Sequence, residues 1–227
     1  LDMISEVYTT FGFTDFWVRI STHDPKNKKK YIGDPQIWED SEATLTKLIK
    51  DRGWTHEVGV GEAAFYGPKL DFIFKDVLRR EWQLSTIQLD MNLPQRFELE
   101  YTDAESQKQR PVVIHRAILG STERFLGILI EHFAGKFPLW LAPLQVKILP
   151  ISEKFSTYGE SILRKLHADG FRATLDGANE TLGKRIRAAQ LAQIPYILIV
   201  GEKEVQANTV SVRHSVKGDL GAMSTET

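Results

Sequence analysis

Residues 111–125, PVVIHRAILGSTERF, carry the pattern with the clearest chemical potential. An apolar run leads into Gly120, and the apolar spacing from Phe125 to Phe133 then predicts a helix with Arg124 in its first turn. A cation there opposes the helix dipole, whereas a bound anion would be held by the dipole, the free N–H groups and the guanidinium together. This placement favours phosphate binding. An arginine turned to solvent or to a carboxylate is the alternative, and local physics leaves both open.

A second group of polar residues lies on two neighbouring stretches with strand character. Gln83, Thr86 and Gln88 share one stretch, and Lys69 directly precedes the other. Thr86 and Gln88 face the same side of their strand, but Gln83 has the opposite parity. The three converge only if the strand bends or bulges near Leu84. Outward-facing strand residues and a lysine in a solvated loop are the alternatives.

Two residues with ring side chains are further candidates for a functional site. His115 lies in the apolar run before Gly120, and Tyr66 lies in the segment AFYGPK. A lone histidine is more often a satisfied sheet residue than a metal ligand, because a zinc site needs clustered ligands. For Tyr66, ordinary aromatic packing is the alternative.

The elements that must position these residues fall into two groups, divided near residue 143. Closely spaced prolines in FPLWLAP, residues 137–143, prevent a helix from continuing there. Before this point several strands follow one another without intervening helices, which predicts an antiparallel sheet in an α+β domain, residues 1–143. The expected strands are 16–20, 70–74, 82–90 and 111–119, and a helix is expected over 35–50.

The remaining residues, 144–227, alternate between strand and helix patterns. Strands separated by helices predict a compact α/β module with a mostly parallel sheet. The expected strands are 146–151, 171–175, 196–200 and 210–213, and the expected helices are 155–168 and 181–192.

Composition limits the functional classes. The 42% hydrophobic and 26% charged content is that of a folded globular protein, and no apolar run approaches the length of a membrane span. Without cysteine there is neither a disulfide framework nor a thiolate metal ligand, so a cytoplasmic location is expected. A net charge of -1 means that any nucleic-acid contact must come from local patches. The start at Leu1 suggests a fragment.

In order and spacing, several segments resemble the threonyl-tRNA synthetases, which are class II aminoacyl-tRNA synthetases. GSTERF after an apolar strand is similar to motif 3 of class II enzymes, whose arginine contacts the γ-phosphate of ATP. The further matching segments are IHRAILGS, AFYGPK, WQLSTIQLD and WLAPLQV. The resemblance covers essentially the whole chain. It implies the C-terminal part of a class II catalytic domain, residues 1–143, followed by an anticodon-binding domain, residues 144–227.

The resemblance also implies roles for single residues. Arg124 and Lys69 would act at the γ- and α-phosphates of ATP with magnesium, and Gln83 and Thr86 would be further ATP contacts. The implied threonine-binding residues are Tyr66, Gln88, His115 and Ser121. His115 would also be one of three zinc ligands, beside a cysteine and a histidine earlier in the chain, so the zinc site is expected to be incomplete here. The open position on zinc would bind the amino and hydroxyl groups of threonine and reject valine.

The second domain would read the tRNA. Its segment NETLGKRIR begins a predicted helix with three basic residues in four positions. The positions matching the family's anticodon contacts are Asn179, Arg187, Lys203, Glu204 and Arg213. Amides, carboxylates and guanidinium groups read the edges of single-stranded bases, while cations hold the backbone. The alternative for Lys184 and Arg185, and for Arg187, is a solvated helix face.

The implied activity is ligation of threonine to threonine tRNA, with ATP, by a homodimeric full-length protein. Motifs 1 and 2 of the class are not present in this chain, so on its own it is expected to be inactive. Two alternatives remain: a non-catalytic synthetase-like tRNA-binding protein, and a class II synthetase of another amino-acid specificity.

Overall fold

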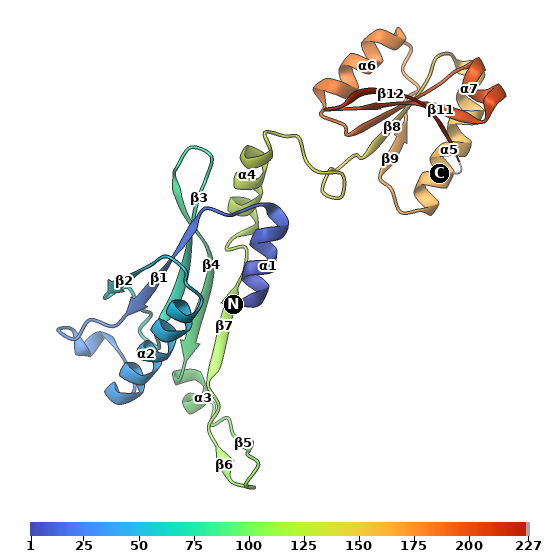
Figure 1. Ribbon diagram of the computed structural model, residues 1–227. Coiled ribbons are helices and arrows are strands. Elements are labelled where there is room, and N and C mark those ends of the chain that lie inside the picture. Colours follow the sequence, from blue (N-terminus) through green and yellow to red (C-terminus); the bar gives the residue numbers. More distant parts are fainter. Residues whose placement is uncertain (226–227) are drawn as a thin grey trace. The chain divides into compact units, whose positions relative to one another are not determined.

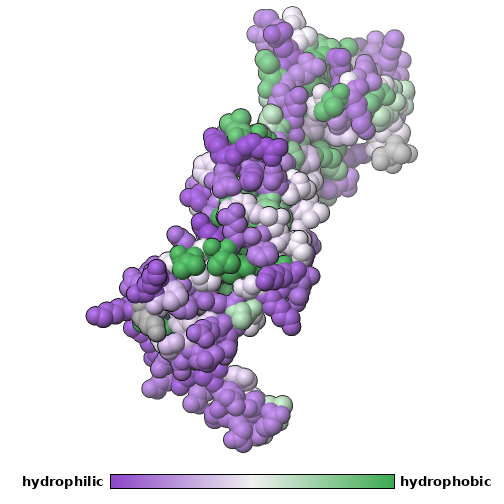
Figure 2. Space-filling model, turned by 60° about the vertical axis from the view of Figure 1, so that its left-hand side comes forward, coloured by the Kyte–Doolittle hydropathy of each residue, from purple (hydrophilic) through white to green (hydrophobic). Residues whose placement is uncertain are grey.

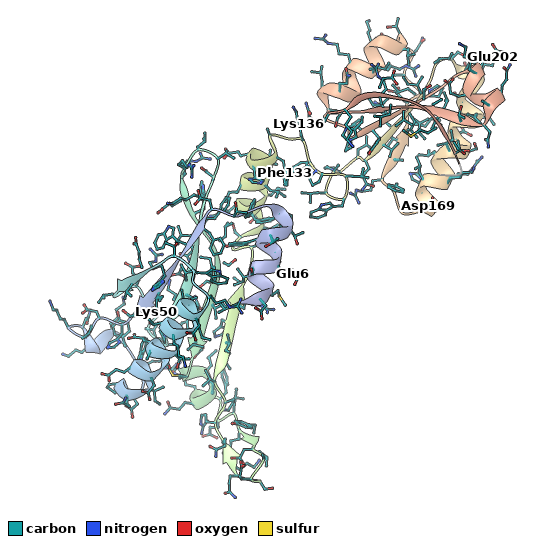
Figure 3. The ribbon with its side chains drawn as sticks, viewed as in Figure 1. Glu6, Lys50, Phe133, Lys136, Asp169 and Glu202 are labelled. Carbon is teal, nitrogen blue, oxygen red and sulfur yellow. The ribbon has the colours of Figure 1, made fainter. Side chains whose placement is uncertain are left out.

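The chain folds into two compact units, which are described separately. The computed structural model describes residues 1–225, with Lys28 described by its backbone alone. The first unit is Leu1–His132, and the second begins at Phe133, which Figure 3 labels at the end of a helix. The sequence predicted a boundary near residue 143, ten residues later. The difference has a local cause, because Arg172 of the second unit donates hydrogen bonds to the carbonyl oxygens of Trp140 (2.9 Å) and Ala142 (2.8 Å) and so holds the proline-rich turn.

Figure 1 shows the order of the elements. The helices and strands of the first unit are α1 Asp2–Phe11, β1 Phe16–Thr22, η1 Lys28–Lys30, α2 Pro35–Asp51, β2 His56–Val60, β3 Lys69–Lys75, β4 Glu81–Asp90, α3 Asn92–Arg96, β5 Tyr101–Thr102, β6 Lys108–Gln109, β7 Val113–Ala117 and α4 Thr122–Phe133. Those of the second unit are β8 Val146–Pro150, η2 Glu153–Phe155, α5 Ser156–Ala168, β9 Ala173–Leu175, α6 Leu182–Leu191, β10 Tyr196–Val200, α7 Glu202–Ala207, β11 Thr209–His214 and β12 Gly218–Ser224.

The first unit is built on a five-stranded sheet in the order β2-β1-β3-β4-β7. Strands β1, β3, β4 and β7 pair antiparallel, which confirms the sheet predicted from the sequence. Only β2 at the edge runs parallel to its neighbour β1. The short β5–β6 hairpin projects away from this sheet (Figure 1).

Helices cover one face of this sheet. Tyr8 of α1 packs edge-on against Phe16 of β1 at 5.2 Å and against Phe72 of β3 at 6.3 Å between ring centroids. Phe125 of α4 packs against Phe11 at the end of α1, and the two helices lie side by side (Figure 1). Burial of these aromatic rings stabilises the unit. The other face of the sheet carries polar side chains.

A bulge in β4 decides which side chains reach the polar face. Thr86 pairs with Asp71, but Gln83 pairs with Ile73, so that Leu84 and Ser85 together stand opposite Phe72. The extra residue reverses the parity, and Gln83 therefore faces the same side as Thr86. The sequence required such a bulge near Leu84, and the structure has it there.

The bulge is held from both sides. The backbone N–H of Ser85 donates to the Tyr8 hydroxyl (3.3 Å), and the Ser85 hydroxyl donates to the carbonyl oxygen of Ile118. Gly120 has a left-handed φ of 68°, and a Cβ there would lie 2.7 Å from the carbonyl oxygen of Leu84. Only glycine fits this joint between β7 and α4 without strain.

The second unit has a five-stranded sheet in the order β12-β11-β10-β8-β9. Strands β9, β8 and β10 are parallel, as predicted, while β11 and β12 add an antiparallel edge. The chain leaves β8 to form β9 on one side and then crosses to β10 on the other side. The core on one face contains Ile148, Ile162, Leu198 and Val212, all buried.

In the part of the chain that the structure describes, no helix has both the length and the apolar character needed to cross a membrane. Figure 2 shows a mostly hydrophilic surface on one side of the molecule, interrupted by small apolar patches.

Replacing Gly120 with alanine should destabilise the first unit by about 2–4 kcal/mol, because the new Cβ adds a left-handed strain to a clash with backbone. Urea unfolding followed by tryptophan fluorescence measures this, since four of the five tryptophans lie in the first unit. The matched control is Gly127→Ala on the open side of α4, where a Cβ meets nothing within 4 Å. That variant should gain about 0.5–1 kcal/mol from helix propensity. Equal effects of the two changes would contradict the role assigned to Gly120.

Candidate functional site

The polar face of the first sheet is organised around the fully buried carboxylate of Asp71. Its Oδ1 accepts hydrogen bonds from Gln83 Nε2 (2.8 Å) and Thr86 Oγ1 (3.0 Å). Its Oδ2 accepts from Lys69 Nζ (2.7 Å) and Ser21 Oγ (2.9 Å). Three of the predicted site residues, Lys69, Gln83 and Thr86, therefore meet at one carboxylate.

A second cluster lies beside it, where β4 pairs with β7. The Tyr66 hydroxyl donates to Gln88 Oε1 at 2.6 Å, and the rings of Tyr66 and His115 lie 6.1 Å apart. Gln88 and His115 are register partners on adjacent strands. Three residues that the sequence assigned to one amino-acid pocket are thus neighbours in space. Burial, with the charge of Asp90 adding to it, raises the pKa of Tyr66, so its hydroxyl stays protonated and donates.

His115 is oriented by a buried carboxylate. Its Nε2 lies 2.8 Å from Oδ2 of Asp90. Burial by itself would raise the pKa of Asp90, but hydrogen bonds from His115 and from the backbone amides of Leu93 and Asn92 outweigh it and lower the pKa. A carboxylate behind a histidine fixes the ring orientation and is the usual support of a metal-binding histidine.

These residues do not form a metal site among themselves. Within residues 1–225, no group of three or more His, Cys, Asp or Glu side chains is arranged to hold a metal ion. The described residues therefore do not fit a resident zinc ion without ligands from elsewhere.

Arg124 lies in the first turn of α4, as the sequence predicted. Its backbone N–H donates to Ser121 Oγ (3.2 Å), which makes Ser121 the helix cap. Its guanidinium donates to the carbonyl oxygen of Gln83 (3.1 Å) and lies 5.8 Å from the ring centroid of Trp82. Arg124 is exposed. The guanidinium is thus held beside Gln83 and stays accessible to an anion.

In the second unit a crevice of about 660 Å³ lies beyond the carboxyl ends of the parallel strands β8 and β9. It lies where the chain crosses from one side of β8 to the other, which is the usual ligand position in open parallel sheets. Its lining includes Pro150, Asp176, Asn179, Glu180 and Arg185. Asn179, predicted from the sequence, is therefore exposed at the edge of a preformed crevice.

The basic residues of α6 divide into three kinds. Arg185 is buried and donates to the carbonyl oxygens of Asp176 (3.2 Å) and Pro150. It is therefore a structural residue, and the solvated helix face considered as its alternative is wrong. Lys184 pairs with Glu180 at 3.0 Å on the exposed surface. Arg187 is exposed and stays a candidate for the anticodon contact.

The other candidate anticodon residues also differ in surroundings. Lys203 is exposed on α7, the helix marked by Glu202 in Figure 3, while Arg213 is half-buried on β11. Glu204 already accepts hydrogen bonds from the Gly201 backbone (2.9 Å) and from Ser211 Oγ (2.7 Å). Its carboxylate therefore caps α7, whatever else it contacts.

Comparisons with known proteins agree with the two units described above. Residues 1–133 match the family model of the tRNA synthetase class II core domain (G, H, P, S and T), which is more than half of the chain. The chain belongs to the class II tRNA synthetase core family. Residues 145–227 match the anticodon binding domain, so the two matched segments leave residues 134–144 between them.

Individual relatives of this class II chain are threonine–tRNA ligases. The protein of that name from Parabacteroides distasonis is 52% identical over 227 residues, and that from Bacteroides fragilis is 51% identical over 226 residues. The chain is covered completely in both comparisons, but it spans only 35% of the length of each relative. The solved RNA binding domain of threonyl-tRNA synthetase from Cryptosporidium parvum is 38% identical with a TM-score of 0.88, covering 99% of this chain and 56% of that one.

The sequence analysis did not single out Asp71 and Asp90, the two carboxylates that hold the side chains on the polar face of the first sheet. Asp71 stands in the otherwise apolar run LDFIF, and a charge inside a buried strand requires partners, so a signal was present. Asp90 shares its parity with Thr86 and Gln88, which placed it on the same face. Neither observation says which side chains become the partners.

Asp76, in the β3–β4 hairpin, should make the stability of the first unit depend on pH. Burial favours its neutral form, but hydrogen bonds from Trp82, Arg80 and the Leu78 backbone prevail and lower its pKa from 3.8 to about 2. The ionised form is therefore favoured by folding. Its stabilising contribution is complete above pH 3.8 and is lost as the pH falls through about 2.

The substitution Asp76→Asn should accordingly lower the urea midpoint at neutral pH and flatten its dependence on pH in that acidic window. Asp15→Asn is the control, because the Asp15 carboxylate is half-exposed in a surface ion pair with Arg79. An acid limb of unchanged slope in the Asp76 variant would contradict the assignment.

Proposed function

We propose that this chain supplies the threonine- and ATP-binding half-site and the anticodon-binding domain of a threonine–tRNA ligase. The observation that supports this best is the convergence of Tyr66, Gln88 and His115 beside Gln83, Thr86 and Arg124 on one sheet face. The relatives named threonine–tRNA ligase extend well beyond the matched region, so the activity is proposed for the whole protein.

The ATP side of the site would work by electrostatics and positioning. Phosphoryl and adenylyl transfer need charge neutralisation at the phosphate oxygens more than they need covalent chemistry by the protein. The exposed guanidinium of Arg124 offers a planar set of donors, suited to a terminal phosphate. Gln83 and Thr86 would orient the nucleotide, and bound magnesium would supply further positive charge to the phosphates.

The threonine side would work by matched hydrogen bonds. Tyr66, Gln88 and His115 offer one hydroxyl, one amide and one ring nitrogen within a small area. A site that hydrogen-bonds a substrate hydroxyl rejects an analogue without it, because its own polar groups are then left unpaired. His115 would be the contribution of this chain to a zinc site, with the other ligands coming from outside the described residues.

The second unit would bind the anticodon loop of threonine tRNA. Support comes from the match to the anticodon binding domain and from the crevice at the carboxyl ends of β8 and β9. Splayed bases of a loop need such a pocket together with amide and cationic groups at its edge. Asn179 and Arg187 are the exposed candidates nearest in sequence to that edge.

Two other functions compete with this proposal. A synthetase-like protein without catalysis would keep the fold while losing the ATP contacts, yet Gln83, Thr86 and Arg124 are in place together. A class II enzyme for another amino acid would be expected to alter the Tyr66–Gln88–His115 cluster. Both alternatives are decided by the same assay.

The assay is threonine-dependent ATP–pyrophosphate exchange in a completed enzyme, in which this chain replaces the matching 35% of the Parabacteroides distasonis relative. Exchange is expected with threonine and not with valine. Arg124→Ala should lower kcat/KM for ATP by roughly 100- to 1000-fold, as loss of a charge-stabilising donor does. Arg79→Ala is the matched control, because that guanidinium is on the β3–β4 hairpin and 78% exposed. No exchange with threonine, or equal exchange with valine, would overturn the proposal.

RNA binding by the 227-residue chain tests the second unit. A threonine-tRNA anticodon stem-loop should bind with an affinity that falls as salt rises. Arg187→Ala should weaken binding by about tenfold, and Asn179→Ala should reduce discrimination against a scrambled anticodon. Lys184→Ala removes the same charge from the same helix and is the control for a general field effect. Equal loss in the Arg187 and Lys184 variants would show that Arg187 makes no specific contact.

A further inference from the structure

We propose that Asp71 is a positioning residue of the half-site, one that touches no substrate but fixes the side chains of Lys69, Gln83 and Thr86. This inference rests on the proposed function for its kinetic consequences. Its structural part, the fixing of three side chains by one carboxylate, stands on the geometry alone.

The position of Asp71 in the sheet makes this possible. It lies on β3, the central strand, and pairs with Arg19 of β1 on one side and Thr86 of β4 on the other. Its side chain is therefore surrounded by residues of three strands. With no exposed surface, it is out of reach of a substrate.

The hydrogen bonds of Asp71 use its whole acceptor capacity. A carboxylate offers about four lone-pair sites, and Asp71 accepts four hydrogen bonds, from Gln83, Thr86, Lys69 and Ser21. Arg19 adds a longer charge contact of 3.6 Å to Oδ2. Such a saturated carboxylate fixes each donor in one direction, so the donors lose the rotational freedom that polar strand residues ordinarily keep.

The two oxygens of Asp71 serve different donors. Oδ1 holds the neutral groups of Gln83 and Thr86, whereas Oδ2 holds the Lys69 ammonium. Lys69, expected from the sequence to lie near the α-phosphate, is only 16% exposed and already paired with a carboxylate. An ammonium has three donor positions, so one points at Asp71 and the other two stay available. Asp71 therefore sets the direction from which Lys69 can approach a phosphate.

Because the two oxygens of Asp71 hold different donors, two substitutions of Asp71 should have different effects. Asp71→Asn keeps an oxygen for Gln83 and Thr86 but puts an amide where Lys69 needs an acceptor. Asp71→Ala removes both oxygens. The first variant should release Lys69 alone, and the second should release all three side chains. Asp76→Asn is the matched control, since it alters a buried carboxylate of the β3–β4 hairpin whose hydrogen bonds go to Arg80 and Trp82 instead of to the three side chains.

The structural part is tested on the 227-residue chain by competitive acetylation of lysines, read by mass spectrometry. Lys69 should be acetylated several-fold faster in both Asp71 variants than in the parent chain, relative to the exposed Lys136. The side-chain amide protons of Gln83 should exchange faster with solvent only in Asp71→Ala. Unchanged Lys69 labelling in both variants, or an equal increase in Asp76→Asn, would overturn the proposal.

The kinetic part is tested in the completed enzyme by pyrophosphate exchange. Asp71→Asn should lower kcat by about tenfold with little change in KM for ATP, because only the Lys69 contact changes. Asp71→Ala should in addition raise KM for ATP by about tenfold, because Gln83 and Thr86 are released. Indistinguishable kinetics in the two variants would overturn the assignment. An inactive parent enzyme would count against the proposed function instead, and the labelling result would then decide the role of Asp71.

Discussion

The bulge in β4 is the constraint on which the polar face of the first sheet depends. In a regular strand Gln83 would point toward the helices, and the backbone carbonyl that holds Arg124 would turn with it. The two residues of the bulge, Leu84 and Ser85, are clamped by Tyr8, by Ile118 and by the close approach of Gly120. Packing on the helix-covered face of the sheet thus fixes the chemistry on the other face.

Successive side chains of each strand point to opposite faces of the first sheet, so one face packs against helices and the other carries the polar side chains. Rings from α1 and α4 pack on one side, where burial supplies the free energy of folding. On the other side polar groups are hydrogen-bonded to one another instead of to solvent, and among the described side chains of this face the Arg19 Nε alone is buried without a partner. The buried carboxylates of Asp71 and Asp90 are the main acceptors of these hydrogen bonds. Such a face is ready for a ligand before the ligand arrives, which lowers the cost of ordering it.

The sequence predicted the strands of both sheets well because their patterns are long and apolar, and the parity conflict of Gln83 even predicted the bulge. Among the elements that it did not predict are α1, β2 and β12. Helix α1 is short, and its place depends on burying Ile4 and Tyr8 against residues far along the chain. Strand β2 contains a glycine and exposed valines, so only its pairing with β1 defines it. The partners of Asp71 come from three strands, and no local pattern encodes which side chains will meet across a sheet.

The charges on the polar face indicate the kind of ligand that it suits. Arg19, Lys69 and Arg124 bring three cations, and the buried Asp71 is the carboxylate that faces two of them. Lys69 is held tightly and Arg19 more loosely, while Arg124 rests on a carbonyl oxygen and an aromatic ring, which leave its charge unneutralised. The excess of positive charge is therefore greatest at the start of α4, where the helix dipole adds to it. A polyanionic ligand would place its most highly charged end there, which is the end of the site that the proposed function assigns to the terminal phosphate of ATP.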